Sequence, residues 1–128
     1  MGSDPNFTSS VKLGSDPGFY TGITMMLGSL EEQVMLAVVR TKDEAYGMNV
    51  RRELEAVTGR ELAIGSIYAT LDRLEAKKLV SSTRTAESGD APSRRVFAVT
   101  RAGAAALEHT RELRDRLWAG VKLGTAKP

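Results

Sequence analysis

The sequence contains no cysteine and one histidine among its 128 residues, and aromatic residues make up only 5%. Without cysteine there can be no disulfide framework, no thiolate nucleophile and no cysteine-ligated metal site. The single histidine, His109, has no second histidine or cysteine to complete a ligand set. No glycine-rich phosphate loop follows a predicted strand, and the serines lack a paired base. These absences argue against an enzyme, and we expect neither a metal nor a cofactor.

Long hydrophobic runs are absent as well. No window approaches the roughly 18 apolar residues of a membrane span, and no secretory signal appears. A hydrophobic content of 41% and a charged content of 27% are typical of a soluble globular protein. The length suits one domain, since a domain typically takes about 100–200 residues. We therefore expect a cytoplasmic protein that makes no membrane contact.

The charge is unevenly distributed, although the formal net charge is only +2. Residues 73–101 contain seven Lys or Arg and three Asp or Glu, so seven minus three gives +4. A local basic excess is typical of a face that binds a polyanion. The plainer alternative is a solvated charged surface.

The first 24 residues differ from the rest in composition. GSDPNF at residues 2–7 nearly repeats as GSDPGF at residues 14–19, and no apolar periodicity runs through the segment. We interpret residues 1–24 as a disordered tail or a cloning-derived leader, with Met25 or Met26 as the natural start.

Three amphipathic helices are predicted next. Ser29 and Glu32 have the spacing of a capping box, and residues 30–38 carry an apolar stripe before Lys42-Asp43-Glu44 ends the helix. The second helix spans about 46–58, with an apolar stripe of Val50, Leu54 and Val57 and with Gly59 as its left-handed stop. A third helix begins near Gly65 or Ser66, one of which should be the N-cap.

A hairpin and a long helix follow. Residues 79–85 and 94–100 are rich in β-formers and flank a turn cluster at 87–92. Phe97 and Val99 share one strand face and should seal the hairpin onto the core. Thr100 is the expected N-cap of a final helix that reaches about Val121.

This order of elements predicts a mostly helical α+β protein with a winged helix-turn-helix fold. In that fold the third helix enters the major groove of DNA, and the hairpin, or wing, contacts the flanking backbone. We assign residues 25–100 to this domain, 101–122 to a C-terminal helix that mediates dimerisation, and 123–128 to a flexible tail.

Four motifs, in the same order, resemble those of the PadR family of bacterial winged-helix transcriptional regulators, over Leu27 to about Val121. They are Leu27-Gly28-Ser29-Leu30, Ala45-Tyr46-Gly47, Ile67-Tyr68-Ala69-Thr70-Leu71-Asp72-Arg73-Leu74-Glu75 and Val99-Thr100-Arg101-Ala102-Gly103. The sequence departs from the family at Ala69, where many members have proline, and at Val99, where leucine is usual.

The resemblance implies a homodimeric transcription factor, usually a repressor, that binds palindromic promoter DNA and dimerises through the helix after the wing. Some PadR-like proteins bind flat apolar drugs between their subunits. A hydrophobic small-molecule effector is therefore implied as well.

The third helix has two different faces. Ile67, Leu71 and Leu74 form its apolar stripe, and the rest is small, hydroxylic and basic. We expect this second face to enter the major groove, with Arg73 as the strongest candidate for a bidentate contact to guanine or phosphate. Its members are Ser66, Ala69, Thr70, Arg73 and Lys77. The plainer alternative is a wet face of good helix formers.

Other candidate DNA contacts lie beside this helix. Tyr68 either donates its hydroxyl to a phosphate or only packs at the edge of the core. Tyr46 and Gly47 either bring backbone N–H groups near a phosphate or form a tight turn. In the wing, Arg84, Arg94 and Arg95 are candidates for phosphate or minor-groove contacts, and neighbouring strand residues should point to opposite faces.

The last helix has an apolar side long enough for a partner helix. We expect Ala106, Leu113, Leu117, Trp118 and Val121 at a dimer interface, whereas folding back over the three-helix core is the alternative. Trp118 is either an interface anchor or a residue that stacks on a bound effector.

The sequence is compatible with two rival functions. The domain is either a DNA-binding regulator or a winged-helix module that binds protein, which would more often expose aliphatic or aromatic residues on the third helix. A regulator is either responsive to a ligand or controlled by its own abundance.

Overall fold

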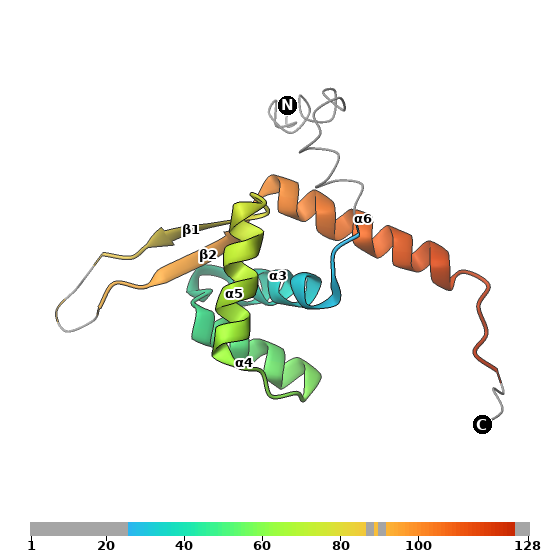
Figure 1. Ribbon diagram of the computed structural model, residues 1–128, viewed down its shortest axis with the longest axis horizontal. Helices are drawn as coiled ribbons and strands as arrows, with labels where there is room; N and C mark the ends of the chain where they lie inside the picture. Colours follow the sequence, from blue (N-terminus) through green and yellow to red (C-terminus); the bar gives the residue numbers. More distant parts are fainter. Residues whose placement is uncertain (1–25, 87–88, 90–91, 125–128) are drawn as a thin grey trace.

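A computed structural model describes residues 26–86, 89 and 92–124. The predicted tail at 1–24 and residues 125–128 lie outside the described residues. The elements are α3 (Ser29–Thr41), the short 3-10 helix η1 (Lys42–Glu44), α4 (Gly47–Thr58), α5 (Ile64–Ala76), β1 (Val80–Arg84), β2 (Arg95–Val99) and α6 (Arg101–Trp118). This order confirms the winged helix-turn-helix prediction. In Figure 1 the hairpin extends to one side of the three packed helices, and α6 crosses above them.

Two of the predicted helix starts, those of α3 and α5, are wrong by one to three residues. The N-cap of α3 is Gly28, whose N–H donates to Oε1 of Glu31 at 3.3 Å. Glu32, which the sequence paired with Ser29, instead forms an ion pair with Arg114 of α6. The N-cap of α5 is Ala63, so Ser66 lies inside the helix.

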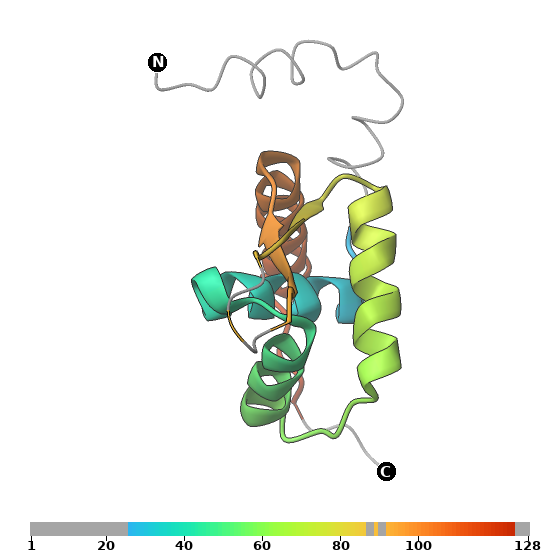
Figure 2. The ribbon, with the colours of Figure 1, turned by 90° about the vertical axis from the view of Figure 1, so that its left-hand side faces the viewer.

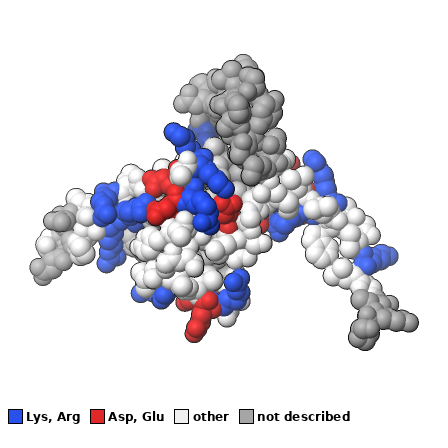
Figure 3. Space-filling model, in the orientation of Figure 1, with Lys and Arg blue, Asp and Glu red and all other residues white. Residues whose placement is uncertain are grey.

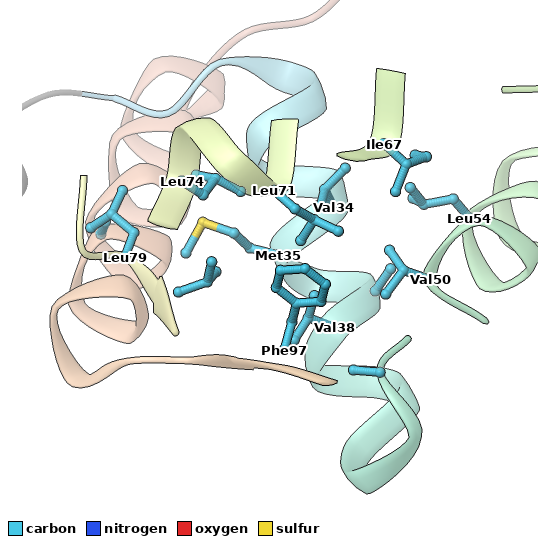
Figure 4. Close-up of a cluster of buried hydrophobic side chains, with 14 residues drawn as sticks. Val34, Met35, Val38, Val50, Leu54, Ile67, Leu71, Leu74, Leu79 and Phe97 are labelled. Atoms are coloured by element: carbon cyan, nitrogen blue, oxygen red, sulfur yellow. The ribbon is translucent and has the colours of Figure 1, made fainter. Parts of the chain in front are cut away.

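The interior is formed mainly by α3, α4, α5 and β2, and Val80 of β1 and Ala106 of α6 add to it. Figure 4 shows Val34, Met35 and Val38 of α3 meeting Val50 and Leu54 of α4, with α5 and Phe97 closing over them. The side chains of α5 that reach this core are Ile67, Leu71 and Leu74. Val57 is 59% exposed, so its predicted place in the core is wrong, because the last turn of α4 extends past the interior.

The two strands form an antiparallel hairpin in which Val80 pairs with Val99 and Arg84 with Arg95. As predicted, Phe97 is buried and Val99 packs against the core. The Phe97 N–H donates to the Ala45 carbonyl at 3.0 Å, which fixes the hairpin to the segment between η1 and α4.

The start of α6 is locked onto the hairpin. Thr100 is its N-cap, as predicted, and its hydroxyl accepts from the Gly103 N–H at 3.0 Å and donates to the Lys78 carbonyl at 2.8 Å. A Cβ at Gly103 would overlap the Leu79 carbonyl, so only glycine permits this approach.

The two halves of α6 have different surroundings. Ala106 is fully buried within its own chain, and the Thr110 hydroxyl accepts from the Leu27 N–H at 3.0 Å. The prediction of Ala106 as an interface residue is therefore wrong: the first half of α6 covers the core. The second half projects beyond it (Figure 1) and ends at Trp118, which leaves Val121 outside the helix.

Candidate nucleic-acid interface

Helix α5 lies across the front of the molecule with one side in the core and a narrow ridge outside (Figures 1 and 2). Ser66 and Ala69 are exposed on this ridge, as predicted. Thr70 is not: it is 1% exposed, and its hydroxyl accepts from Nη2 of Arg73 at 3.4 Å. The physical reason is helical geometry, since Thr70 is three residues after Ile67 and so lies only about 60° from the apolar stripe.

A polar groove of about 540 Å³ opens between the start of α4, the start of α5 and the wing. Its lining combines two tyrosines with four arginines. The residues are Tyr46, Met48, Asn49, Arg52, Tyr68, Arg84, Ser93, Arg94 and Arg95. Five of the eleven predicted DNA-contact residues therefore meet in one place.

Tyr68 reaches this groove by packing over Gly47. A Cβ at Gly47 would overlap the Tyr68 ring and hydroxyl. Gly47 is buried, whereas Tyr68 remains 36% exposed. The glycine is thus required by a close contact between α4 and α5, and the exposed tyrosine edge faces the groove.

The wing arginines point in different directions. The guanidinium of Arg94 lies over the Tyr46 ring, 4.7 Å from its centroid, and Nη1 of Arg84 donates to the Ser93 hydroxyl at 3.3 Å. Arg95 pairs with Glu75 at 2.8 Å and with Asp72 at 3.2 Å. Arg84 and Arg94 are exposed, while Arg95 is tied to α5. Arg94 and Arg95 nevertheless line the same groove, and Arg94 lies just before β2.

Sequence reasoning missed the contribution of α4 to the groove. Nη1 of Arg52 donates to Oδ1 of Asn49 at 3.0 Å, and Met48 lies one turn before Arg52. The spacing of 48, 49 and 52 places them on one face of a helix, which was the available signal.

Arg73 and Lys77 do not line the groove. They lie on the opposite flank of α5, where Oε2 of Glu31 is 2.8 Å from Nζ of Lys77 and 3.8 Å from Nε of Arg73. Burial alone would raise the pKa of Glu31. The hydrogen bonds from Lys77 and the Gly28 N–H, together with the charges of Lys77 and Arg73, nevertheless hold this pKa below its usual range.

The surface over α5 is accordingly mixed in charge. Figure 3 shows blue and red side chains intermingled there, above a mostly uncharged middle of the same face, with further charged side chains along the lower edge. The basic excess counted along the sequence is therefore partly neutralised at close range by Glu31, Asp72 and Glu75. Among the cations expected to contact DNA, Arg84 and Arg94 form no ion pair with a described residue.

The end of α6 and the residues after it carry an exposed apolar surface. Leu117 is 68% exposed and Trp118 57%, although leucine and tryptophan normally lose most of their exposure on folding. Val121 and Leu123 continue this surface, and Leu113 is half-buried beside it.

Other kinds of site find no support in the described part of the chain. Those residues contain no group of three or more His, Cys, Asp or Glu side chains placed to hold a metal ion. Within the same residues, no helix is both long and apolar enough to cross a membrane.

Comparisons with known proteins agree with this architecture. The family model of the transcriptional regulator PadR-like family matches residues 35–109. A PadR-like transcriptional regulator from Bacillus cereus is 26% identical, over 70% of this chain and 84% of its own, with a TM-score of 0.59.

Two further structures are similar in fold. A PadR-like transcription factor from Bacteroides fragilis is 23% identical, over 88% of this chain and 91% of its own, with a TM-score of 0.61. A PadR family transcriptional regulator from Eggerthella lenta is 22% identical, over 90% and 88%, with a TM-score of 0.56. Among curated proteins no sequence matches this chain.

Proposed function

The chain belongs to the PadR-like family of transcriptional regulators, which are transcription factors and not enzymes, and from this premise we propose that it is a repressor. In this proposal a homodimer binds a palindromic operator, with one α5 helix in the major groove of each half-site. The wing of each protomer contacts the backbone beside its half-site.

The observation that carries the proposal is the groove beside the ridge of α5. The major groove of B-DNA, about 12 Å wide, admits one helix. The small side chains of Ser66 and Ala69 let the ridge approach closely. Tyr46, Tyr68, Arg84 and Arg94 stand along one side of the ridge, where a phosphate backbone would run.

Different residues have different parts in this interface. Arg84 and Arg94 bind phosphates and fix the position of the protein on DNA without recognising the base sequence. Arg73 is the residue that we expect to read a base edge, because its side chain is 55% exposed although its Nε lies 3.8 Å from Glu31. Arg52 and Asn49 add contacts from α4. Thr70 supports Arg73 from within and touches no DNA.

The exposed apolar surface around Leu117 and Trp118 supports dimerisation. Truncating the chain before residue 107 would remove most of α6. It would also open the core, because Ala106 and Thr110 are buried in their own chain. Leu117→Asp is the cleaner test, since Leu117 is 68% exposed and its loss leaves the fold intact. Sedimentation should report a dimer for the wild type and a monomer for the variant, with unchanged circular dichroism. If the variant remains dimeric, this surface is not the dimer interface.

The finer points of the proposal rest on the family. A hydrophobic effector would bind near Trp118, which acts either as an interface anchor or as a stacking partner. We place the protein in the cytoplasm of a bacterium, where such regulators act.

The rival function is a module that binds protein. A protein-binding face would expose large apolar residues, but among the described residues that line the groove only Met48, at 38%, and Tyr68, at 36%, do so.

Selection of bound fragments from a pool of random duplex DNA tests the function directly. Enrichment of a palindrome is the expected result, and it would support the dimer at the same time. A pool that shows no enrichment after repeated rounds would refute the proposal and favour the protein-binding module.

A further inference from the structure

Glu31 holds two cations of α5 at the edge of the candidate DNA interface. One carboxylate oxygen accepts from Lys77 at 2.8 Å and lies 3.8 Å from Arg73. The other accepts from the Gly28 N–H. The Glu31 side chain is only 14% exposed, whereas those of Arg73 and Lys77 are 55% and 42% exposed. The acid is fixed in place, and the cations it holds remain within reach of a ligand.

This arrangement acts differently on the two kinds of DNA that a regulator meets. DNA of arbitrary sequence offers only phosphates, and its binding strengthens with each cation that displaces a counterion. A cation already paired with a protein carboxylate gains little by moving to a phosphate. An operator also offers base edges, whose hydrogen bonds can offset the loss of the Glu31 contacts.

We propose that Glu31 is a specificity-determining residue that keeps Arg73 and Lys77 from binding the phosphates of DNA of arbitrary sequence. The inference rests on the proposed DNA-binding function. Glu31 is a positioning residue in this account, because it acts through the two cations and touches no DNA.

Glu31→Gln tests the inference, and Glu32→Gln is the matched control. The two residues are neighbours on α3 and their substitutions change the net charge equally, but Glu32 pairs with Arg114 of α6 and not with Arg73 or Lys77. Glutamine keeps the oxygen that accepts from the Gly28 N–H, so the start of α3 is preserved. The probe is a mixed-sequence duplex, titrated against the full chain over a series of salt concentrations.

We expect Glu31→Gln to bind this duplex about threefold to tenfold more tightly near 0.1 M salt, with a salt slope steeper by about one to two. Glu32→Gln should stay close to the wild type. When Arg73 and Lys77 are both replaced by glutamine, the further change Glu31→Gln should have no more effect than Glu32→Gln. If the two single variants gain equally, net charge explains the result and the inference is overturned.

A measurement on the wild type does not depend on any variant folding. The NMR signal of the Arg73 Nε–H should keep its position when mixed-sequence duplex is added, while that of Arg94 moves. An equal movement of both signals would overturn the inference. A wild type that binds no duplex even at low salt would instead refute the proposed function itself.

Discussion

The two flanks of α5 use charge in opposite senses. Toward the wing, α5 supplies the carboxylates of Asp72 and Glu75, and β2 supplies Arg95. Toward α3, Arg73 of α5 and Lys77, the C-cap of α5, supply the cations, and α3 supplies Glu31. Between the flanks runs an exposed ridge of small side chains.

The difference shows how one helix can be anchored to the core and still expose side chains to a ligand. The ion pairs on both flanks are partly exposed, and each contributes at most about 1 kcal/mol to stability. Their main effect is to fix where charged groups stand. The anchoring itself comes from the apolar side of α5, which both flanks share.

The largest effect should come from that shared side. Leu71→Ala removes a side chain that is fully buried in the middle of α5 and should destabilise the fold by about 2–5 kcal/mol. Chemical denaturation measures the loss, and both flanks should unfold in the same transition. Separate transitions for the wing and for the Glu31 contact would mean that the flanks do not share one core.

A change at Gly47 should affect the wing flank alone. Gly47→Ala would push Tyr68 out of its place, because the added Cβ overlaps the ring. We expect operator affinity to fall by about 1–3 kcal/mol, the range for one lost specific contact. Fluorescence anisotropy with a selected duplex gives the value.

Gly65→Ala is the control for this change. Gly65 also lies near the groove end of α5, but a Cβ there meets nothing within 4 Å. The alanine should stabilise the helix by about 0.5–1 kcal/mol and leave DNA affinity nearly unchanged. Equal losses of affinity in the two glycine variants would break the assignment of Tyr68 to the groove.

The smallest predicted effect is the loss, at acid pH, of the stability that the Glu31 contacts contribute on the α3 flank. The pKa of Glu31 in the folded protein lies below its usual value of 4.5. The Glu31 contacts therefore stabilise the fold above that pH, and this contribution disappears as the pH falls through the lowered pKa.

Thermal unfolding of the wild type and of Glu31→Gln should show this loss of stabilisation by the Glu31 contacts. The difference between their melting temperatures should be greatest near neutral pH and shrink as the pH falls below 4.5 and through the lowered pKa. A difference that does not change with pH would contradict the ion pairs on this flank.

Much of this arrangement could be predicted from the sequence, since periodicity alone placed Ile67, Leu71 and Leu74 in the core and Phe97 beneath the wing. The errors occurred where tertiary contacts decide. Ala106 is buried because the neighbouring elements cover it, and Glu32 pairs with an arginine 82 positions away in the chain. No local pattern contains such information.

The candidate site was predictable residue by residue but not as a surface. Tyr46, Tyr68 and Arg94 were expected to contact DNA, yet the groove that they share depends on how α4, α5 and the hairpin pack. For the same reason no pattern in the sequence indicates that Arg73 and Lys77 contact Glu31. Charge counting along the chain cannot detect neutralisation across space.

The most direct test of the central claim, that DNA binds along the ridge of α5 and its wing flank, is an amide NMR titration with a duplex from the selection. We predict the largest shifts at Asn49, Ser66, Tyr68 and Arg94, with the amide of Thr110 unmoved. Shifts concentrated around Leu117 and Trp118, with the groove residues unaffected, would contradict the account.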